Sequence, residues 1–284
     1  MRGINLGGAL DGGPPAEWLG AWVFDVVRDA GFDMVRLPVR WPRPFDAVDR
    51  AVEQALERGL EVVIDVHHDH ELSADPVGEG PRFLALWERI AAHYADADPR
   101  LALELFNEPH PPITAARWNE LLPRALAAVR ESNPSRTVIA GPVEWNNVEA
   151  LPALQLPADE HIVATVHYYH PFRFTHQGAT WLPEAAPWIG TGWGSDADRA
   201  AIRADLESAA AWARERGVRL FLGEFGVVEH ADIAARAAWA AHVRTEAERL
   251  GLSWAYWDFA TDFGAYDLAR REWRAPLAAA LGCR

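Results

Sequence analysis

Eight short apolar segments alternate along the sequence with longer segments of helical periodicity, and this alternation restricts the fold more than any other feature. The expected strands cover residues 2–7, 33–41, 61–68, 101–108, 137–145, 161–169, 219–226 and 252–259. The expected helices lie between most of them, at 16–30, 46–59, 81–97, 113–132, 198–217 and 231–250, with a last helix at 271–281. Such alternation is typical of parallel strands joined by crossover helices.

The link between the fifth and sixth strands is the one place where no helix is expected. Residues 150–159 are a short segment with two prolines, so we expect a loop or a single turn there. Eight consecutive strands with right-handed crossovers close most economically into a (β/α)8 TIM barrel, an α/β fold. No internal repeat or linker divides the 284 residues, and we therefore expect a single barrel domain over residues 1–284.

The fourth strand ends in an amide and a carboxylate. Asn107 and Glu108 follow a hydrophobic run and precede Pro109, which has no N–H with which to extend a ladder. Barrel enzymes place their chemistry at the carboxyl ends of the strands, so Glu108 is a candidate catalytic residue. Because Asn107 and Glu108 are adjacent, strict alternation would point them to opposite faces, and we expect a bulge or twist if both face one site.

The seventh strand ends in a second carboxylate. Its period of two places Leu220, Leu222 and Glu224 on one face, and a carboxylate at the end of an inward apolar row is costly unless it is paired or used. We therefore expect Glu108 and Glu224 on the same rim of the barrel. Opposed carboxylates are what glycoside cleavage requires, although two glutamates in structural ion pairs would give the same pattern.

Side chains at other strand ends could support such a pair. Arg36 in the second strand would neutralise a carboxylate and help to keep it ionised. His67 ends the third strand and is expected to hydrogen-bond a substrate or a carboxylate. His167 and Tyr169 share one face of the sixth strand and could hold the attacking carboxylate, and Trp257 of the eighth strand offers a flat surface for a sugar ring.

The third strand also ends in a cluster of metal-ligand types. His67, His68, Asp69 and His70 make a metal-dependent barrel hydrolase an alternative. Against it, the adjacent His67 and His68 are expected to point to opposite sides of a strand, and the other strand ends supply no convincing further ligands. We therefore expect no metal and no cofactor. Loss of activity in a chelator, restored by a divalent ion, would favour the alternative.

The charge of the chain excludes some partners. With 27 Lys and Arg against 41 Asp and Glu, the net charge is -14, and no basic patch for nucleic acid is expected. There is no run of about 18 apolar residues that would span a membrane, and the residues after Met1 do not resemble a signal peptide. The single cysteine, Cys283, cannot form an intramolecular disulfide.

Tryptophan is unusually frequent, with 14 residues. Sugar-binding sites favour flat rings, because the C–H faces of a sugar pack on an aromatic plane. Trp145, after the fifth strand, and Trp181, in the long irregular segment 170–196, are candidate platforms for flanking sugars. A sugar-binding barrel without catalysis is a further alternative, although the two glutamates argue against it.

With these strand ends read together, the sequence resembles glycoside hydrolase family 5. The resemblance covers nearly the whole chain, from Arg2-Gly-Ile-Asn-Leu-Gly to Phe263-Gly-Ala-Tyr-Asp267. Its strongest motifs are Phe106-Asn-Glu-Pro109 and Gly223-Glu-Phe-Gly226. The resemblance implies that Glu108 is the general acid/base and that Glu224 is the nucleophile of a retaining mechanism.

Carried over by position, the family pattern gives roles to the other rim residues. Asn107 would hold the 2-hydroxyl of the sugar being cleaved, and Trp257 would be the platform beneath it, with a non-proline cis bond often following this tryptophan. The carboxylates and the ring would be oriented by Arg36, His67, His167 and Tyr169. Asn5 and His68 could bind a sugar in a more distant subsite.

The segment Pro171–Trp181 looks like the loop after strand six in bacterial endoglucanases of this family, some of which also cleave mannan. The resemblance implies a retaining endo-β-1,4-glucanase, or cellulase, that acts on β-1,4-linked polysaccharide or oligosaccharide. An endo-β-1,4-mannanase or a mixed-specificity β-glycanase is the alternative. Because many members are exported, we expect a secreted monomer in the native context, with a cytoplasmic location as the alternative.

Overall fold

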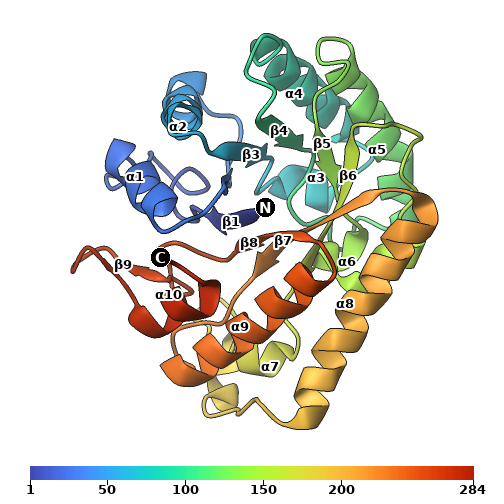
Figure 1. Ribbon diagram of the computed structural model, residues 1–284. Helices are drawn as coiled ribbons and strands as arrows, with labels where there is room; N and C mark the ends of the chain where they lie inside the picture. Colours follow the sequence, from blue (N-terminus) through green and yellow to red (C-terminus); the bar gives the residue numbers. More distant parts are fainter.

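A computed structural model describes residues 1–284 and contains a closed barrel of eight parallel strands in chain order (Figure 1). The strands are β1 (Arg2–Asn5), β2 (Met34–Leu37), β3 (Glu61–Asp65), β4 (Leu101–Glu104), β5 (Val138–Ala140), β6 (Ile162–Tyr168), β7 (Arg219–Phe225) and β8 (Ser253–Tyr256). Strand β1 pairs with both β2 and β8, which closes the barrel. The prediction of a (β/α)8 TIM barrel is therefore confirmed.

Helices surround the strands, as Figure 1 shows. The main helices are α1 (Ala21–Asp29), α2 (Phe45–Glu57), α4 (Gly80–His93), α5 (Ala115–Arg130), α8 (Asp196–Arg216), α9 (Ile233–Arg249) and α10 (Ala275–Leu281). Short elements in the loops are α3 (His70–Ala74), α6 (Val143–Asn146), α7 (Phe172–Thr175), the 3-10 turns η1 (Val148–Ala153) and η2 (Pro183–Trp188), and the antiparallel pair β9 (Tyr266–Asp267) and β10 (Glu272–Trp273). No helix combines the length and the apolar character that crossing a membrane requires.

Local sequence explains where the longest helix begins and ends. Ser195 accepts a hydrogen bond from the N–H of Asp198, whose carboxylate accepts one from the N–H of Ser195 in return. Gly217 ends the helix at φ 65°, a left-handed conformation that glycine adopts without strain. These signals fix α8 within two residues of the predicted 198–217.

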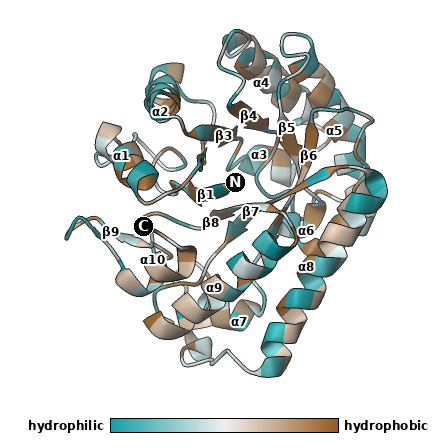
Figure 2. Cartoon of the chain, viewed as in Figure 1, coloured by the Kyte–Doolittle hydropathy of each residue, from teal (hydrophilic) through white to brown (hydrophobic).

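The core has an inner and an outer part. Inside the barrel, Met34, Val63, Ile139, Val163, Phe221 and Ala255 form a small apolar cluster. A much larger cluster fills the space between the strands and the helices, and Figure 2 shows β4, β5 and β6 as apolar strands next to helices with hydrophilic stretches. Two residues beyond Met34 and Val63, the inward positions hold Arg36 and Asp65. Because every second residue of a strand faces inward, the barrel interior changes along these strands from an apolar layer to a charged layer.

Most strands end earlier than the sequence pattern predicts. The fifth was expected to reach residue 145 but ends at Ala140. Glu144, Trp145 and Asn146 instead adopt left-handed backbone conformations, with φ of 59°, 56° and 56°. Each such non-glycine residue costs about 1–2 kcal/mol, so this turn persists only because its surroundings impose it. The link to β6 contains only the short elements α6 and η1, and residues 150–159 form no longer helix, as predicted.

Candidate active site

The carboxyl ends of the strands surround a cleft of about 950 Å³. Ten of the predicted site residues line it, namely His67, His68, Asn107, Glu108, Trp145, His167, Tyr169, Trp181, Glu224 and Trp257. Arg36 and Asn5 lie beneath it and are fully buried. The cleft thus unites residues from β3 to β8 that are far apart in the sequence.

Glu224 reaches the barrel interior through a bulge in β7. The pairing register with β6 shifts so that Leu222 lies opposite Val166 while Glu224 lies opposite His167, which leaves Gly223 as an extra residue. A Cβ atom on Gly223 would lie 2.7 Å from the Thr165 hydroxyl oxygen, so a side chain does not fit there.

This bulge corrects the predicted inward row of the seventh strand. Phe221 belongs to the apolar cluster inside the barrel, whereas Leu220 and Leu222 belong to the outer core. Leu220 and Leu222 therefore do not share the face of Glu224. Strict alternation failed here because it cannot count a bulged residue.

Two donors hold the carboxylate of Glu224. Its Oε1 atom accepts a hydrogen bond from Arg36 Nη1 at 2.8 Å, and its Oε2 atom accepts one from the Tyr169 hydroxyl at 2.7 Å. Burial raises the pKa of Glu224 to about 7, while His167, Arg36 and the Tyr169 hydroxyl act in the opposite direction. Its side chain is only 5% exposed.

Glu108 is the more exposed of the two carboxylates. Strand β4 stops at Glu104, and the predicted bulge or twist takes the form of backbone bends at Leu105 and Asn107. The Glu108 side chain is 23% exposed, and its Oε1 atom lies 2.7 Å from His167 Nδ1. Burial raises the pKa of Glu108 to about 7, against the opposing charge of Arg36.

The two carboxylates face each other across a short gap. An oxygen of Glu108, an oxygen of Glu224 and a ring nitrogen of His167 all lie within 4.8 Å of one another. Retaining glycosidases hold their carboxyl groups about 5–5.5 Å apart, whereas inverting enzymes need about 6.5–9.5 Å to admit a water molecule. This arrangement suits direct attack on a sugar by one carboxylate while the other transfers a proton.

Arg36 is the centre of a buried charge cluster beneath the cleft. Its guanidinium forms ion pairs with Glu104 at 2.6 Å, Glu224 at 2.8 Å and Asp65 at 2.9 Å. It also donates to the side-chain oxygen of Asn107 at 2.6 Å. Burial alone would lower the pKa of Arg36, but the three carboxylates hold that pKa well above its usual value. Asp65 and Glu104 were missed in the sequence, although each ends an inward row.

Replacing Arg36 by Met is expected to lower the free energy of unfolding by about 3–5 kcal/mol, because the substitution leaves buried carboxylates without their cation. Chemical denaturation at neutral pH would measure this loss. The control is Arg58→Met, which breaks a partly exposed pair with Asp25 and is expected to lose no more than about 1 kcal/mol. Equal losses in the two variants would contradict the structural role of Arg36.

Asn5 is not placed to bind a sugar, contrary to the prediction. Its side chain is completely buried and donates to the carbonyl oxygens of Gly223 at 3.0 Å and Tyr256 at 3.2 Å. The side-chain oxygen of Asn5, Oδ1, accepts a hydrogen bond from Arg36 Nη1 at 2.9 Å. Asn5 therefore belongs to the layer beneath the cleft, because β1 ends below the rim.

His67 and His68 both line the cleft, so the prediction that they point to opposite sides is wrong. Strand β3 ends at Asp65, and alternation does not extend past it. Their ring centroids lie 4.5 Å apart, and His67 stacks on Trp257 at 5.5 Å. Burial lowers the pKa of His67 to about 3 and that of His68 to about 4, so both rings are neutral at pH 7.

The cluster proposed as a metal site in the metal-dependent alternative is not assembled as such. Asp69 accepts a hydrogen bond from the N–H of Leu72 at the start of α3 and forms an ion pair with Arg82 at 2.5 Å. The carboxylate that lies near both His67 and His68 is instead Asp11, with ligand-type atoms within 4.8 Å of one another. His67 Nδ1 also lies 2.9 Å from the buried Asp65 Oδ2, which confirms the prediction that His67 hydrogen-bonds a carboxylate. Asp11 was not identified from the sequence.

Three tryptophans present rings to the cleft. Trp145 and Trp181 are 50% and 53% exposed, which leaves ring surface free for a ligand. Trp145 also stacks on His110, with ring centroids 5.3 Å apart. Trp257 lines the same cleft as the two carboxylates, and the bond between Trp257 and Asp258 is cis, as the resemblance suggested.

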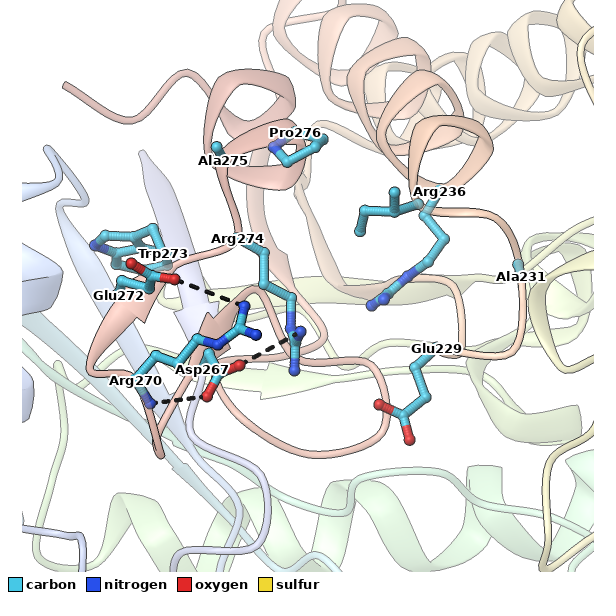
Figure 3. A pocket seen from close by; sticks show the side chains of 11 residues that line it. Glu229, Ala231, Arg236, Asp267, Arg270, Glu272, Trp273, Arg274, Ala275 and Pro276 are labelled. Carbon is cyan, nitrogen blue, oxygen red and sulfur yellow. Dashed lines mark hydrogen bonds and ion pairs between the residues drawn. The ribbon is translucent and has the colours of Figure 1, made fainter.

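A second hollow of about 530 Å³ lies beside the hairpin of β9 and β10 (Figure 3). Several of its charged groups pair with one another: the Asp267 carboxylate accepts a hydrogen bond from the N–H of Arg270 at 3.0 Å and lies 3.7 Å from the guanidinium of Arg274. Arg236 is 3% exposed and donates to the carbonyl oxygen of Phe263 at 2.9 Å. Because Phe263 lines the cleft, Arg236 attaches the wall of the cleft to α9.

Comparison with known proteins gives a consistent result. The family model that matches is Cellulase (glycosyl hydrolase family 5), over residues 13–262. Endoglucanase H of Acetivibrio thermocellus is 31% identical over 281 residues, which cover 93% of this chain and 30% of that protein. Cellodextrinase A of Ruminococcus flavefaciens is 30% identical over 257 residues, which cover 81% of this chain and 76% of that protein. The chain thus spans less than a third of the first relative.

Solved structures resemble the chain over almost its whole length. Structures of Thermotoga maritima Cel5A in complex with cellobiose and with mannotriose each give a TM-score of 0.95 and 38% identity. Each alignment covers 99% of this chain and 96% of the other. The family model matches 13–262, well over half of the sequence, and the barrel and the paired strand-end glutamates agree with it. The chain belongs to the cellulase family, glycosyl hydrolase family 5.

Proposed function

We propose that residues 1–284 act as one catalytic domain, a retaining endo-β-1,4-glucanase that cleaves internal β-1,4-glucosidic bonds by double displacement. The observation that carries the proposal is the approach of Glu108 and Glu224 to within 4.8 Å in an open cleft. Family membership and the relatives named as endoglucanases support the same activity.

In the first step, the carboxylate of Glu224 attacks the anomeric carbon and the glycosidic C–O bond breaks. Glu108 gives its proton to the departing oxygen, so the leaving sugar departs as a neutral alcohol. The different surroundings of the two carboxylates support these roles, since Glu224 accepts from Arg36 and Tyr169 while Glu108 has only His167 and lies nearer to solvent. The product of this step is a glycosyl ester on Glu224.

In the second step, Glu108 works as a base. Its carboxylate takes a proton from a water molecule while the water oxygen attacks the anomeric carbon, and the ester bond to Glu224 breaks. Each step inverts the configuration of the anomeric carbon, so the product retains the configuration of the substrate. Asn107, held by Arg36, is proposed to contact the 2-hydroxyl, and Trp257 to lie beneath the ring, with His67, His68, Trp145 and Trp181 serving sugars along the cleft.

The pH dependence of kcat/KM should be bell-shaped. Glu108 must be protonated to act as the acid, and its pKa is about 7, so activity should fall as the pH rises through about 7. The pKa of Glu224 is also about 7, but the two carboxylates repel each other and therefore ionise in two separate steps. Arg36 and Tyr169 favour the carboxylate of Glu224, so the first step belongs to Glu224 and its protonation stops the attack on the acid side. Initial rates from about pH 4 to about pH 9 test this, and constant activity across the neutral range would contradict the acid role of Glu108.

The direct test is a reducing-sugar assay on carboxymethyl cellulose and on β-mannan, with product sizes measured over time. Release of mixed internal fragments from the glucan would support the proposal. A mannanase or mixed-specificity enzyme is the second candidate, favoured by the mannotriose complex of Thermotoga maritima Cel5A, and faster release from mannan would favour it. Activity lost in a chelator and restored by a divalent ion would instead favour the metal-dependent alternative.

We further propose that the protein works as a monomer outside the cell. All candidate catalytic groups come from one copy of the chain, which supports a site that is complete in a monomer. A polymeric glucan cannot enter a cell, so an enzyme that attacks it must be exported. Size-exclusion chromatography and fractionation of the native host would test these two points.

A further inference from the structure

The left-handed turn after β5 brings one amide side chain beside the acid/base residue. Asn146 is completely buried, and its Nδ2 atom donates to the carbonyl oxygen of Asn107. Its Oδ1 atom has no hydrogen-bond partner, and a Cβ atom on Gly141 would lie 2.2 Å from that oxygen. The space for Asn146 therefore depends on Gly141 having no side chain, and the amide is oriented by what its nitrogen contacts.

The same turn holds the backbone on both sides of Glu108. Asn146 binds the carbonyl oxygen of Asn107, the residue before it, and the N–H of Trp145 donates to the carbonyl oxygen of Pro109, the residue after it, at 3.1 Å. Beyond the turn, Asn147 resumes parallel pairing beside His167. The three strained residues 144–146 are thus anchored to the segment that carries the proposed acid.

The amide of Asn146 also lies next to the ring of His167. Its Nδ2 atom lies 3.4 Å from His167 Nε2, and an amide nitrogen can only donate, so Nε2 must be the unprotonated acceptor. Burial lowers the pKa of His167, which favours the uncharged ring, and an uncharged ring with Nε2 as the acceptor carries its one proton on Nδ1. Nδ1 lies 2.7 Å from Glu108 Oε1 and 3.5 Å from Glu224 Oε2, so the N–H donates to Glu108.

We propose that Asn146 is a positioning residue for the acid/base step, acting by fixing the Nδ1–H tautomer of His167 and the backbone on the N-terminal side of Glu108. The proposal rests on the proposed function of Glu108 as the acid. Asn146 itself does not touch the cleft, so its effect must pass through His167 and the Asn107 carbonyl.

The expected direction of the pH effect follows from this contact. An N–H donated to Glu108 favours its carboxylate, and loss of the fixed tautomer lets His167 accept from the protonated acid instead, which favours the carboxylic acid. The other charged or titratable groups that act on Glu108 are Arg36 from β2, Asp65 from β3, Glu104 from β4, Tyr169 from the loop after β6, Glu224 from β7 and His110 from the same loop. None of these changes in an Asn146 variant, so the alkaline limb of kcat/KM should move to higher pH.

The test compares Asn146→Gly with the wild type, because glycine adopts the left-handed conformation without strain and removes only the amide. Nitrogen-15 NMR of the imidazole rings reads the tautomer of His167 directly, and its signals are assigned by their absence in His167→Gln. The matched control is Arg271→Gly, which also relieves a left-handed residue, at φ 56°, on the surface outside the cleft.

In the wild type and the Arg271→Gly control, His167 should be protonated at Nδ1 alone. In Asn146→Gly it should populate the Nε2–H tautomer. Glu108 then stays protonated to higher pH but donates its proton to His167 Nδ1 instead of the leaving oxygen, so kcat/KM on cellooligosaccharides should fall by about 10–100-fold. An aryl cellobioside with a good leaving group, which does not need an acid, should lose less than about 3-fold. An unchanged tautomer, or equal losses on both substrates with an unmoved pH profile, would overturn the proposal.

If Asn146→Gly does not fold, Asn146→Asp is measured in its place. Its carboxylate accepts where the amide donated, so it should draw the proton to Nε2, and retention of the Nδ1–H tautomer there would overturn the proposal as well. The NMR measurement needs no substrate. A wild type that is inactive on β-glucans but shows the Nδ1–H tautomer, lost in the variants, would therefore refute the glucanase function and leave the coupling of Asn146 to His167 intact.

Discussion

Glu224→Gln is expected to lower kcat on carboxymethyl cellulose by about 10⁴-fold or more, because no other group is placed to form the glycosyl ester. The fold should survive, since glutamine has the same shape and Arg36 keeps its ion pairs with Asp65 and Glu104. Reducing-sugar rates, together with thermal unfolding of the same preparation, would measure both effects.

Glu229→Gln is the matched control for this experiment. Glu229 follows the same strand but lies in the second hollow rather than in the cleft, so its loss should leave activity unchanged. Residual activity of Glu224→Gln above about 1% of wild type, in protein free of wild-type contamination, would remove Glu224 from the role of nucleophile.

Glu108→Ala is expected to separate substrates by their leaving groups. Hydrolysis of polysaccharide should fall by about 10²–10⁴-fold, because the departing alcohol needs a proton. On an aryl cellobioside with a good leaving group, kcat/KM should fall much less, since formation of the glycosyl ester no longer needs an acid. The second step still lacks its base, so the ester should accumulate and appear as a burst of released phenol followed by slow turnover.

A small anionic nucleophile can replace the missing base. Azide should speed turnover of the aryl substrate by Glu108→Ala and yield the glycosyl azide with retained β-configuration, because it attacks the ester without losing a proton. Glu149→Gln, on the exposed surface outside the cleft, is the control: it should hydrolyse both substrates at the wild-type rate, and azide should not change that rate. Equal losses on both substrates, or an azide product of inverted configuration, would refute the assigned roles.

The barrel fold and the two strand-end glutamates could be predicted from the sequence because both produce local patterns. Apolar runs and helical periodicity fixed eight strands in order, and Asn107 and Glu108 followed an apolar run before a proline. The Arg36 contact to Glu224 was also expected, because a buried guanidinium needs a carboxylate.

What the sequence could not supply depends on contacts between distant segments. Asn5 seemed free to bind a sugar until closure of β1 against β8 buried it among backbone carbonyls. The inward face of β7 was misassigned because a bulge at Gly223 leaves no mark except the glycine itself. Asn146 carried no signal at all, since its left-handed conformation is imposed by the segment around Glu108.

The buried ion pairs of Arg36 cannot all form until late in the synthesis of the chain. Translation delivers Arg36, Asp65 and Glu104 first, and Glu224 arrives only after most of the chain has been synthesised. An unfinished barrel therefore contains Arg36 and two of its carboxylate partners, but the third partner, Glu224, is still missing. The proposed hydrolytic activity should therefore appear only when the seventh and eighth strands have completed the ring, so its appearance during synthesis or refolding would mark the moment of barrel closure.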